Sequence, residues 1–190
     1  MKKLMRILSC VLTVCMLSVA VSLASVSVAQ ASSENERIIH DYLAESLHLN
    51  DAAISGILAN MECESGLKSD IYNSNHSSYG LCQWSGSRLT NLKNFCNRNG
   101  YDWRSMTGQL HFLQYELTNS YAKVLSYLRG VPNSASGAYN AGYYFCAHFE
   151  IPANTSGRSA QRGGIAQNKY WNHWSSCNHG TQPKTYSYAY

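Results

Sequence analysis

The sequence predicts a mainly α-helical domain built around one buried helix, with a small β-hairpin or loop flap directly after that helix. Three observations support this fold class. Apolar residues recur at helical spacing in several segments separated by Gly, Pro or Asn. The segment 51–65 is apolar on nearly every side, as expected of a helix in the middle of a domain. Residues 67–84 show no helical period and are rich in Ser, Asn and Gly, which favours turns.

The first predicted helix covers residues 36–47. Its apolar residues repeat at helical spacing and form one buried stripe, made of Ile38, Ile39, Tyr42, Leu43 and Leu47. The pattern ends at residues 48–50, where Asn50 or Asp51 is placed to cap the next helix.

The central helix is predicted over residues 51–65 and ends at Gly66, a favoured helix stop. One of its faces is a stripe of large apolar side chains: Ile54, Ile57, Leu58 and Met61. The opposite face carries small residues, namely Ala52, Gly56, Ala59 and Cys63. Such a face lets another backbone approach closely.

The rest of the chain is predicted to be helical after the flap at 67–84. One helix starts at Ser85 or Ser87 and stops at Asn99-Gly100; the next is capped by Thr107. Three more are predicted over residues 121–130, over the second buried segment 133–149, and from Ser156 or Ser159 to Trp174.

The two ends of the chain are predicted to lie outside this domain. Residues 1–31 carry basic residues, an apolar run and an Ala29-Gln30-Ala31 cleavage pattern, which together indicate a signal peptide. We therefore expect a secreted protein without a stable membrane anchor, with a catalytic or binding domain at 32–175 and a polar tail at 176–190.

The charge balance argues against a nucleic-acid partner. The chain has 15 Lys and Arg against 11 Asp and Glu, but Lys2, Lys3 and Arg6 belong to the predicted signal peptide, which leaves 12 against 11. Charged residues are sparse while Tyr is abundant, at 14 residues, and this surface chemistry suits a carbohydrate. We expect a monomer.

Five cysteines lie outside the predicted signal peptide: Cys63, Cys82, Cys96, Cys146 and Cys177. An odd number allows at most two internal disulfides, and buried free thiols are the alternative. Because the Cys and His residues lack zinc-site spacing, no metal site is predicted, and no cofactor is expected.

Glu64 is the candidate catalytic acid. It lies three residues after Met61, so it borders the apolar stripe at the end of the buried helix, whereas Glu62 points away from that stripe. Burial against apolar surface raises the pKa of a carboxyl, and a carboxyl that stays protonated can act as a general acid. From the periodicity alone, a Glu that merely ends the helix in solvent fits equally well.

The motifs around Glu64 resemble those of a known family. Glu64-Ser65-Gly66-Leu67, followed by Tyr79-Gly80-Leu81-Cys82-Gln83-Trp84, is similar to a paired motif of lysozyme-like enzymes, and most closely to the phage-tail lysozyme group of peptidoglycan hydrolases. The segments 56–61, 149–152 and 158–170 extend the resemblance over most of residues 36–175. It implies an α+β lysozyme-like fold.

The resemblance also implies a set of site residues. Glu64 would be the catalytic acid and Ser65 a partner that holds the carboxyl or the sugar. Gly80 and Gln83 would form the floor of a cleft, with Tyr79 and Trp84 as stacking platforms for sugar rings. Residues 138–142 are similar to a helix of lytic transglycosylases, which makes Tyr139 a candidate substrate contact. For Tyr79, Trp84 and Tyr139, ordinary packing is the alternative.

A second carboxylate is harder to assign. Asp70 follows at the root of the flap and could activate a water, although a turn-forming Asp is the more common occurrence. Glu150 is the other candidate. We expect it to have a structural role instead, in which its carboxylate bonds the backbone, Arg158 or Arg162.

The sequence thus predicts a peptidoglycan glycosidase that cuts between N-acetylmuramic acid and N-acetylglucosamine, with glycan strands as its partner. The alternatives are a lytic transglycosylase, in which the 6-hydroxyl of the sugar attacks, and a non-catalytic peptidoglycan-binding module. A disulfide-bonded structural protein would leave the paired motif unexplained.

Overall fold

The computed structural model describes residues 33–177, so the predicted signal peptide and residues 178–190 of the predicted tail lie outside the described residues. The chain divides into two units, Met1–Asn35 and Glu36–Tyr190. In the first unit only residues 33–35 are described, and they are helical. The second unit holds the predicted central helix and flap.

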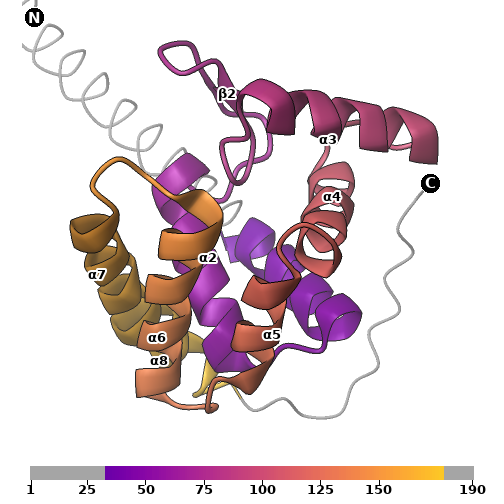
Figure 1. Cartoon of the computed structure of the whole chain (residues 1–190). Coiled ribbons are helices and arrows are strands. Elements are labelled where there is room, and N and C mark those ends of the chain that lie inside the picture. Colours follow the sequence, from indigo (N-terminus) through magenta and orange to yellow (C-terminus); the bar gives the residue numbers. More distant parts are fainter. Residues whose placement is uncertain (1–32, 178–190) are drawn as a thin grey trace, which may run out of the picture. The chain divides into compact units, whose positions relative to one another are not determined.

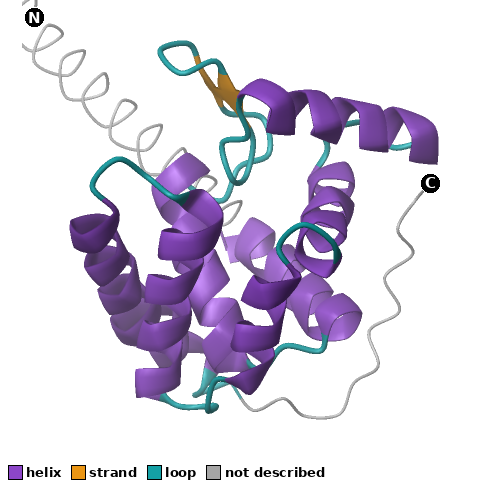
Figure 2. Cartoon of the chain, viewed as in Figure 1, coloured by secondary structure: helices purple, strands orange, loops and turns teal. Residues whose placement is uncertain are grey.

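The second unit is mainly helical with one small antiparallel hairpin, which confirms the predicted fold class (Figures 1 and 2). Its first helical segment is residues 36–47. The later helices are α2 (Asp51–Ser65), α3 (Gly86–Asn99), α4 (Met106–Thr118), α5 (Ala122–Gly130), α6 (Ala135–Phe145), α7 (Thr155–Ile165) and α8 (Asn172–Trp174). Two π-helical segments, η1 (Cys146–Glu150) and η2 (Ala166–Trp171), continue α6 and α7.

Helix α2 is the central helix that the sequence predicts. Every residue from Ala52 to Met61 is buried. Asn50 caps the helix, since its side chain accepts a hydrogen bond from the backbone N–H of Ala53 at 2.9 Å. Gly66 ends it in the left-handed conformation, with φ +64°.

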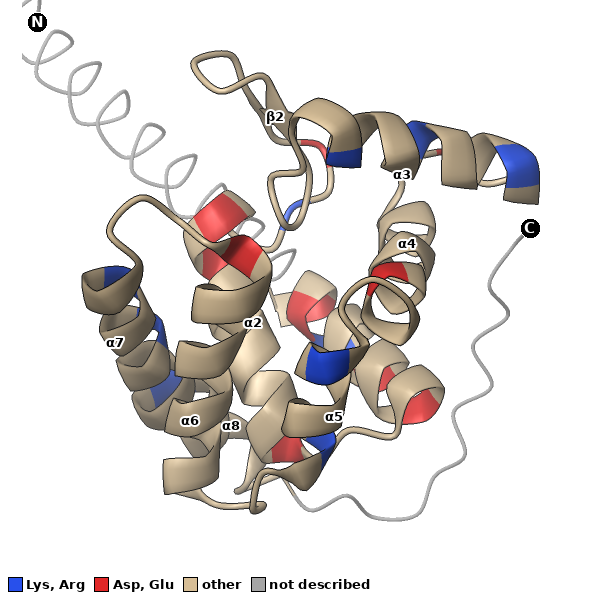
Figure 3. Cartoon of the chain, viewed as in Figure 1, with Lys and Arg blue, Asp and Glu red and all other residues tan. Residues whose placement is uncertain are grey.

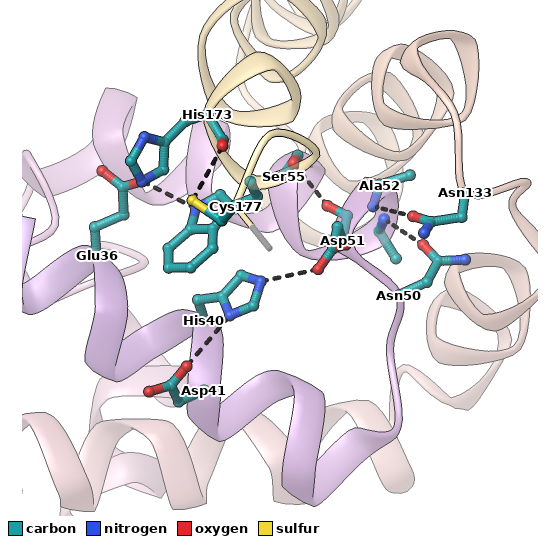
Figure 4. A network of polar contacts seen from close by, with 12 residues as sticks. Glu36, His40, Asp41, Asn50, Asp51, Ala52, Ser55, Asn133, His173 and Cys177 are labelled. Carbon is teal, nitrogen blue, oxygen red and sulfur yellow. Dashed lines mark hydrogen bonds and ion pairs between the residues drawn. The ribbon is translucent and has the colours of Figure 1, made fainter. Parts of the chain in front are cut away.

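The beginning of α2 is held by contacts from distant parts of the chain (Figure 4). His40 Nε2 lies 3.1 Å from Asp51 Oδ1, and the His40 ring stacks on Trp174 at 3.6 Å. Across from these, the backbone N–H of Ala52 donates to the side chain of Asn133 at 3.1 Å. These contacts hold the start of α2 and so set the direction of the helix axis toward its last turn.

The small face of α2 packs directly on α6, as predicted. A Cβ atom added to Gly56 would lie 2.5 Å from the backbone nitrogen of Gly142. Gly142 is itself in close contact with α7, because a Cβ added there would lie 2.8 Å from the Arg162 carbonyl. The three helices therefore lie side by side at backbone distance (Figure 1).

The flap after α2 contains the hairpin of β1 (Tyr72–Asn73) and β2 (Ser78–Tyr79), with Tyr72 opposite Tyr79. Gln109 of α4 ties this segment to the helices: its Nε2 donates to the Ser69 carbonyl at 2.8 Å, and its Oε1 accepts from the Leu81 N–H at 2.9 Å. The predicted hairpin or loop flap is thus confirmed, and it is anchored rather than free-standing.

Two predicted helix starts are wrong. Ser105, not Thr107, caps α4, since its Oγ accepts from the Gly108 N–H at 3.0 Å and Thr107 lies inside the first turn. Helix α7 begins at Thr155 behind an Asn154 cap, earlier than Ser156 or Ser159. In both cases the capping side chain is the one that reaches the N–H three residues later.

None of the five described cysteines is in a disulfide, so the alternative of free thiols describes this structure. Cys82, Cys96 and Cys146 are buried. Within residues 33–177, no helix combines the length and the apolar character that crossing a membrane requires.

We predict that Gly56→Ala destabilises the protein by about 1–3 kcal/mol, because the added methyl group has to displace the backbone of α6. Gly164→Ala on α7 is the matched control: no atom lies within 4 Å of its added Cβ, so it is expected to be neutral or to stabilise by up to about 1 kcal/mol. Urea unfolding of both variants measures the difference. Equal stabilities for the two variants would contradict the close packing of α2 on α6.

Candidate active site

A cavity of about 510 Å³ lies against the last turn of α2. Its walls come from the end of α2, the flap, the start of α3, the end of η1 with the loop after it, and the first turn of α7. Its lining is polar and charged for the most part: Cys63, Glu64, Asn73, His76, Ser78, Cys82, Gln83, Ser85, Arg88, Glu150, Ile151, Pro152 and Arg158.

Glu64 lies in this lining, with its side chain about 20% exposed. Its carboxylate is contacted by the guanidinium of Arg162, whose Nη2 donates to Glu64 Oε1 at 2.5 Å. The helical periodicity did not indicate this contact, because Arg162 reaches the position from α7, 98 residues away in sequence. Glu62 bonds Lys169 and does not line the cavity, in agreement with the prediction that it points away.

Arg162 is itself buried and held on two sides. Its Nη1 donates to Asn60 Oδ1 at 2.9 Å, and Asn60 in turn donates to the carbonyls of Gly56 and Gly142. Burial lowers the pKa of Arg162, but the neighbouring Glu64 carboxylate outweighs it and the net shift is upward. Arg162 therefore stays positively charged beside the Glu64 carboxylate. Figure 3 shows acidic residues near the end of α2 and basic residues along α7.

Glu150 is the second carboxyl group in the cavity lining. Its Oε1 is buried without a hydrogen-bond partner. Burial, with a further contribution from the negative charge of Glu64, raises the pKa of Glu150 to about 8. The expected structural role, in which Glu150 bonds backbone, Arg158 or Arg162, is wrong for this oxygen, because both guanidinium groups of the interior point to other carboxylates.

The segment that carries Glu150 is fixed by Arg88 and Glu116. Arg88 donates to both Glu116 oxygens at 2.8 Å and to the Phe149 carbonyl at 3.3 Å, and it lies 4.4 Å from the Phe149 ring centre. Sequence reasoning missed this pair. The available signal was Glu116, a charged residue between Leu113 and Leu117 on a buried helix face, which requires a cationic partner.

Gln83 lies in the cavity lining, but its side chain bonds within the flap. Its Oε1 accepts from Ser78 Oγ at 2.7 Å, and its Nε2 donates to the carbonyls of Ile71 and Gly80. The structure thus gives Gln83 a role in shaping the wall of the cavity.

Ser65 and Gly80 position the flap. Ser65 is buried and donates to the Leu81 carbonyl at 3.1 Å, which joins α2 to the flap. Gly80 has φ +78°, and a Cβ there would overlap the side chain of Gln109, so this glycine serves the contact with α4.

Six predicted site residues do not line the cavity: Ser65, Asp70, Tyr79, Gly80, Trp84 and Tyr139. Trp84 is buried and donates to Glu116 at 2.8 Å, and Tyr79 packs on Trp103 with ring centres 4.7 Å apart. Tyr139 packs against Gly163 of α7. Asp70 is exposed. Each of the three aromatic residues thus has packing contacts in this structure, and a contact of any of them with substrate stays a prediction.

Within residues 33–177, no group of three His, Cys, Asp or Glu side chains is placed to hold a metal ion. The chemistry available in the cavity is that of two carboxyl groups with different surroundings. Glu64 is paired with a guanidinium, and one oxygen of Glu150 is buried without a hydrogen-bond partner. Such a difference can separate a proton donor from a carboxylate that acts at the same bond.

Comparison with known proteins gives one family. The model of the phage tail lysozyme family matches residues 34–172, which include every helix and strand named above up to the first residue of α8. A search of curated proteins finds no match to the chain.

We predict that Arg162→Lys destabilises the protein by about 1.5–3 kcal/mol, because a single ammonium group cannot bond Asn60 and Glu64 in the same geometry. Arg158→Lys, one turn earlier on α7 and exposed, is the matched control and is expected to change stability by less than about 0.5 kcal/mol. Thermal and urea unfolding measure both. A loss of the same size in the two variants would count against the buried pair.

Proposed function

Because the chain belongs to the phage tail lysozyme family, we propose that it is a secreted peptidoglycan glycosidase that cleaves the bond between N-acetylmuramic acid and N-acetylglucosamine. Membership of this family implies peptidoglycan hydrolase activity. The observation that carries the proposal for this chain is the position of Glu64, which the family motif selects and which lines the cavity at the end of α2.

The polar lining of the cavity supports a glycan as the substrate. Asn73, Ser78 and Ser85 line the flap side and the start of α3. Hydroxyl and amide groups of this kind exchange hydrogen bonds with sugar hydroxyls and N-acetyl groups. In this proposal the strand lies along the flap, with its scissile bond next to Glu64.

Glu64 acts in this proposal as the general acid. Cleavage of a glycosidic bond develops positive charge at the anomeric carbon and needs a proton on the leaving oxygen. Because Arg162 holds Glu64 at Oε1 and Asn60 holds Arg162, the carboxylate keeps one orientation without reorganising during the reaction.

Hydrolysis is favoured over transglycosylation by the second carboxyl group in the lining, Glu150. A transglycosylase can act with one acid, because the 6-hydroxyl of the sugar attacks the anomeric carbon. Tyr139, which suggested the transglycosylase, packs between α6 and α7 and not in the cavity.

The place of action follows from the predicted signal peptide at residues 1–31 and from the substrate. We propose that the protein is exported, loses this peptide and works as a monomer on the cell wall, with the domain at 32–175 as its catalytic part.

We predict that Glu64→Gln lowers the release of muropeptides from purified peptidoglycan by at least about 100-fold, because an amide has no acidic proton to give to the leaving oxygen. Glu62→Gln is the matched control: it lies two residues earlier on α2, bonds Lys169 and does not line the cavity, so its rate should equal that of the wild type. Wall clearance by Glu64→Gln at the wild-type rate would contradict the catalytic role of Glu64, whereas a lack of clearance by the wild type would indicate a non-catalytic binding module.

The products separate the two enzymatic reactions. Mass spectrometry of the wild-type digest should show muropeptides with reducing ends. A digest with 1,6-anhydro ends would instead identify a lytic transglycosylase.

A further inference from the structure

We propose that a second hollow of this chain, the aromatic groove, binds sugar rings of the peptidoglycan glycan. The groove has a volume of about 560 Å³ and lies between residues 119–124, where α4 ends and α5 begins, and Tyr144 of α6 with His148 of η1. It shares no lining residue with the cavity that holds Glu64. The choice of polymer rests on the proposed function, but binding in the groove requires no cleavage.

Three aromatic rings form one stack at the groove. Tyr127 of α5 lies on Tyr144 with ring centres 3.6 Å apart and ring planes 9° apart, and Tyr144 lies on His148 at 3.9 Å and 14°. The stack joins α5 to α6, which lie side by side (Figure 1). Tyr127 is 37% exposed, and His148 is exposed. Because the rings already hold one another, little side-chain freedom is lost when a ligand packs against them.

The turn between α4 and α5 supplies the hydrogen-bonding groups of the groove. Asn119, Ser120 and Lys123 contribute an amide, a hydroxyl and an ammonium group, and Tyr121 adds a further ring. The Nδ2 of Asn119 donates to the Tyr115 carbonyl at 2.8 Å, which orients the amide. Among the residues that line the groove there is no Asp or Glu.

This combination of groups fits a sugar better than other ligands. A pyranose ring presents C–H groups on its faces and hydroxyl or N-acetyl groups at its edge, so it can pack on an aromatic ring and exchange hydrogen bonds at the same time. A purely apolar partner would bury Asn119, Ser120 and Lys123 without partners. An anionic polymer would meet a single Lys in this lining.

The groove adjoins the catalytic cavity across one layer of side chains. The guanidinium carbon of Arg88, which lines the cavity, lies 5.1 Å from the ring centre of Tyr121, which lines the groove. The Phe149 ring lies 4.7 Å from that of Tyr121. The short segment η1 carries His148 to the groove and Glu150 to the cavity. When a glycan occupies the cavity, further sugars of the wall therefore lie close to the groove.

A second contact on the same polymer strengthens attachment to the wall without touching the bond that is cut. Loss of the groove contact should therefore weaken binding to insoluble peptidoglycan and raise KM, while kcat stays at the wild-type value.

The first test measures binding in the absence of cleavage. Glu64→Gln protein is sedimented with purified insoluble peptidoglycan, with and without the added change His148→Ala or Tyr144→Ala. Each added change should weaken binding by about 3- to 10-fold, the size of one aromatic contact. Tyr143→Ala is the matched control, because Tyr143 is 38% exposed on α6 and does not line the groove. Equal binding by all these variants would overturn the proposal.

A further variant guards against loss of the fold, because Tyr144 also packs against the core. Lys123 and His148 are both exposed, so the double change Lys123→Gln with His148→Ala alters only the surface of the groove. We expect it to weaken binding at least as much as His148→Ala alone, at an unchanged melting temperature. A loss of binding that appears only in variants with lowered melting temperatures would contradict a binding role.

The second test locates the ligand by NMR. In ¹⁵N-labelled Glu64→Gln protein, soluble glycan strands freed of their peptides should shift the amide resonances of residues 119–124, Tyr144 and His148. In the variant that also carries His148→Ala, the groove shifts should need about 3- to 10-fold more glycan. Shifts confined to residues of the cavity would overturn the groove, and groove shifts seen only with peptide-bearing fragments would overturn the choice of glycan.

The outcomes separate the groove from the proposed function. Cleavage by the wild type with equal KM in His148→Ala and Tyr143→Ala would overturn the groove alone. Glycan shifts at the groove of a wild type that does not cleave would overturn the proposed function and support the groove. A dimer in solution that His148→Ala dissociates would assign the groove to a second copy of the chain and overturn the proposal.

Discussion

The backbone contact of α2 with α6 and α7 is the constraint on which the site depends. Gly56 and Gly142 remove the side chains that would hold these helices apart, and the resulting distance lets Asn60 bond the carbonyls of both glycines. Asn60 then holds Arg162, and Arg162 holds Glu64. The orientation of the central carboxylate is therefore a consequence of helix packing and is not a local property of the last turn of α2.

An ion pair between Arg88 and Glu116 also holds part of the interior in place. Arg88 and Glu116 fix the segment around Phe149, and this segment carries Glu150 to the cavity. Because each of the two arginines is engaged with another carboxylate, the burial of Glu150 is not compensated by a cation of its own. Burial raises the pKa of Glu150 in this cavity, while the Glu64 carboxylate is paired with Arg162.

In the flap, residues of the sequence motif serve to hold the structure in place. Ser65, Gly80 and Gln83 all belong to the motif that indicates a sugar-binding cleft, and each makes its contacts to the flap or to Gln109. Their common effect is to hold the hairpin beside the end of α2, so that Asn73 and Ser78 form one wall of the cavity. The motif therefore marks the place of the cleft, while other residues form much of its lining.

The sequence by itself determined the helical fold, the buried helix that ends at Gly66, the flap after it and the position of Glu64, because these depend on periodicity, turn residues and short motifs that local physics governs. It also indicated the small face through Gly56. Only the tertiary structure decided that a guanidinium lies beside Glu64, that Trp84 bonds Glu116, that Tyr139 packs against Gly163, and that Oε1 of Glu150 has no hydrogen-bond partner. The physical reason is that these outcomes depend on which side chains from different helices meet, at separations from 32 residues for Trp84 and Glu116 to 102 residues for Asn60 and Arg162.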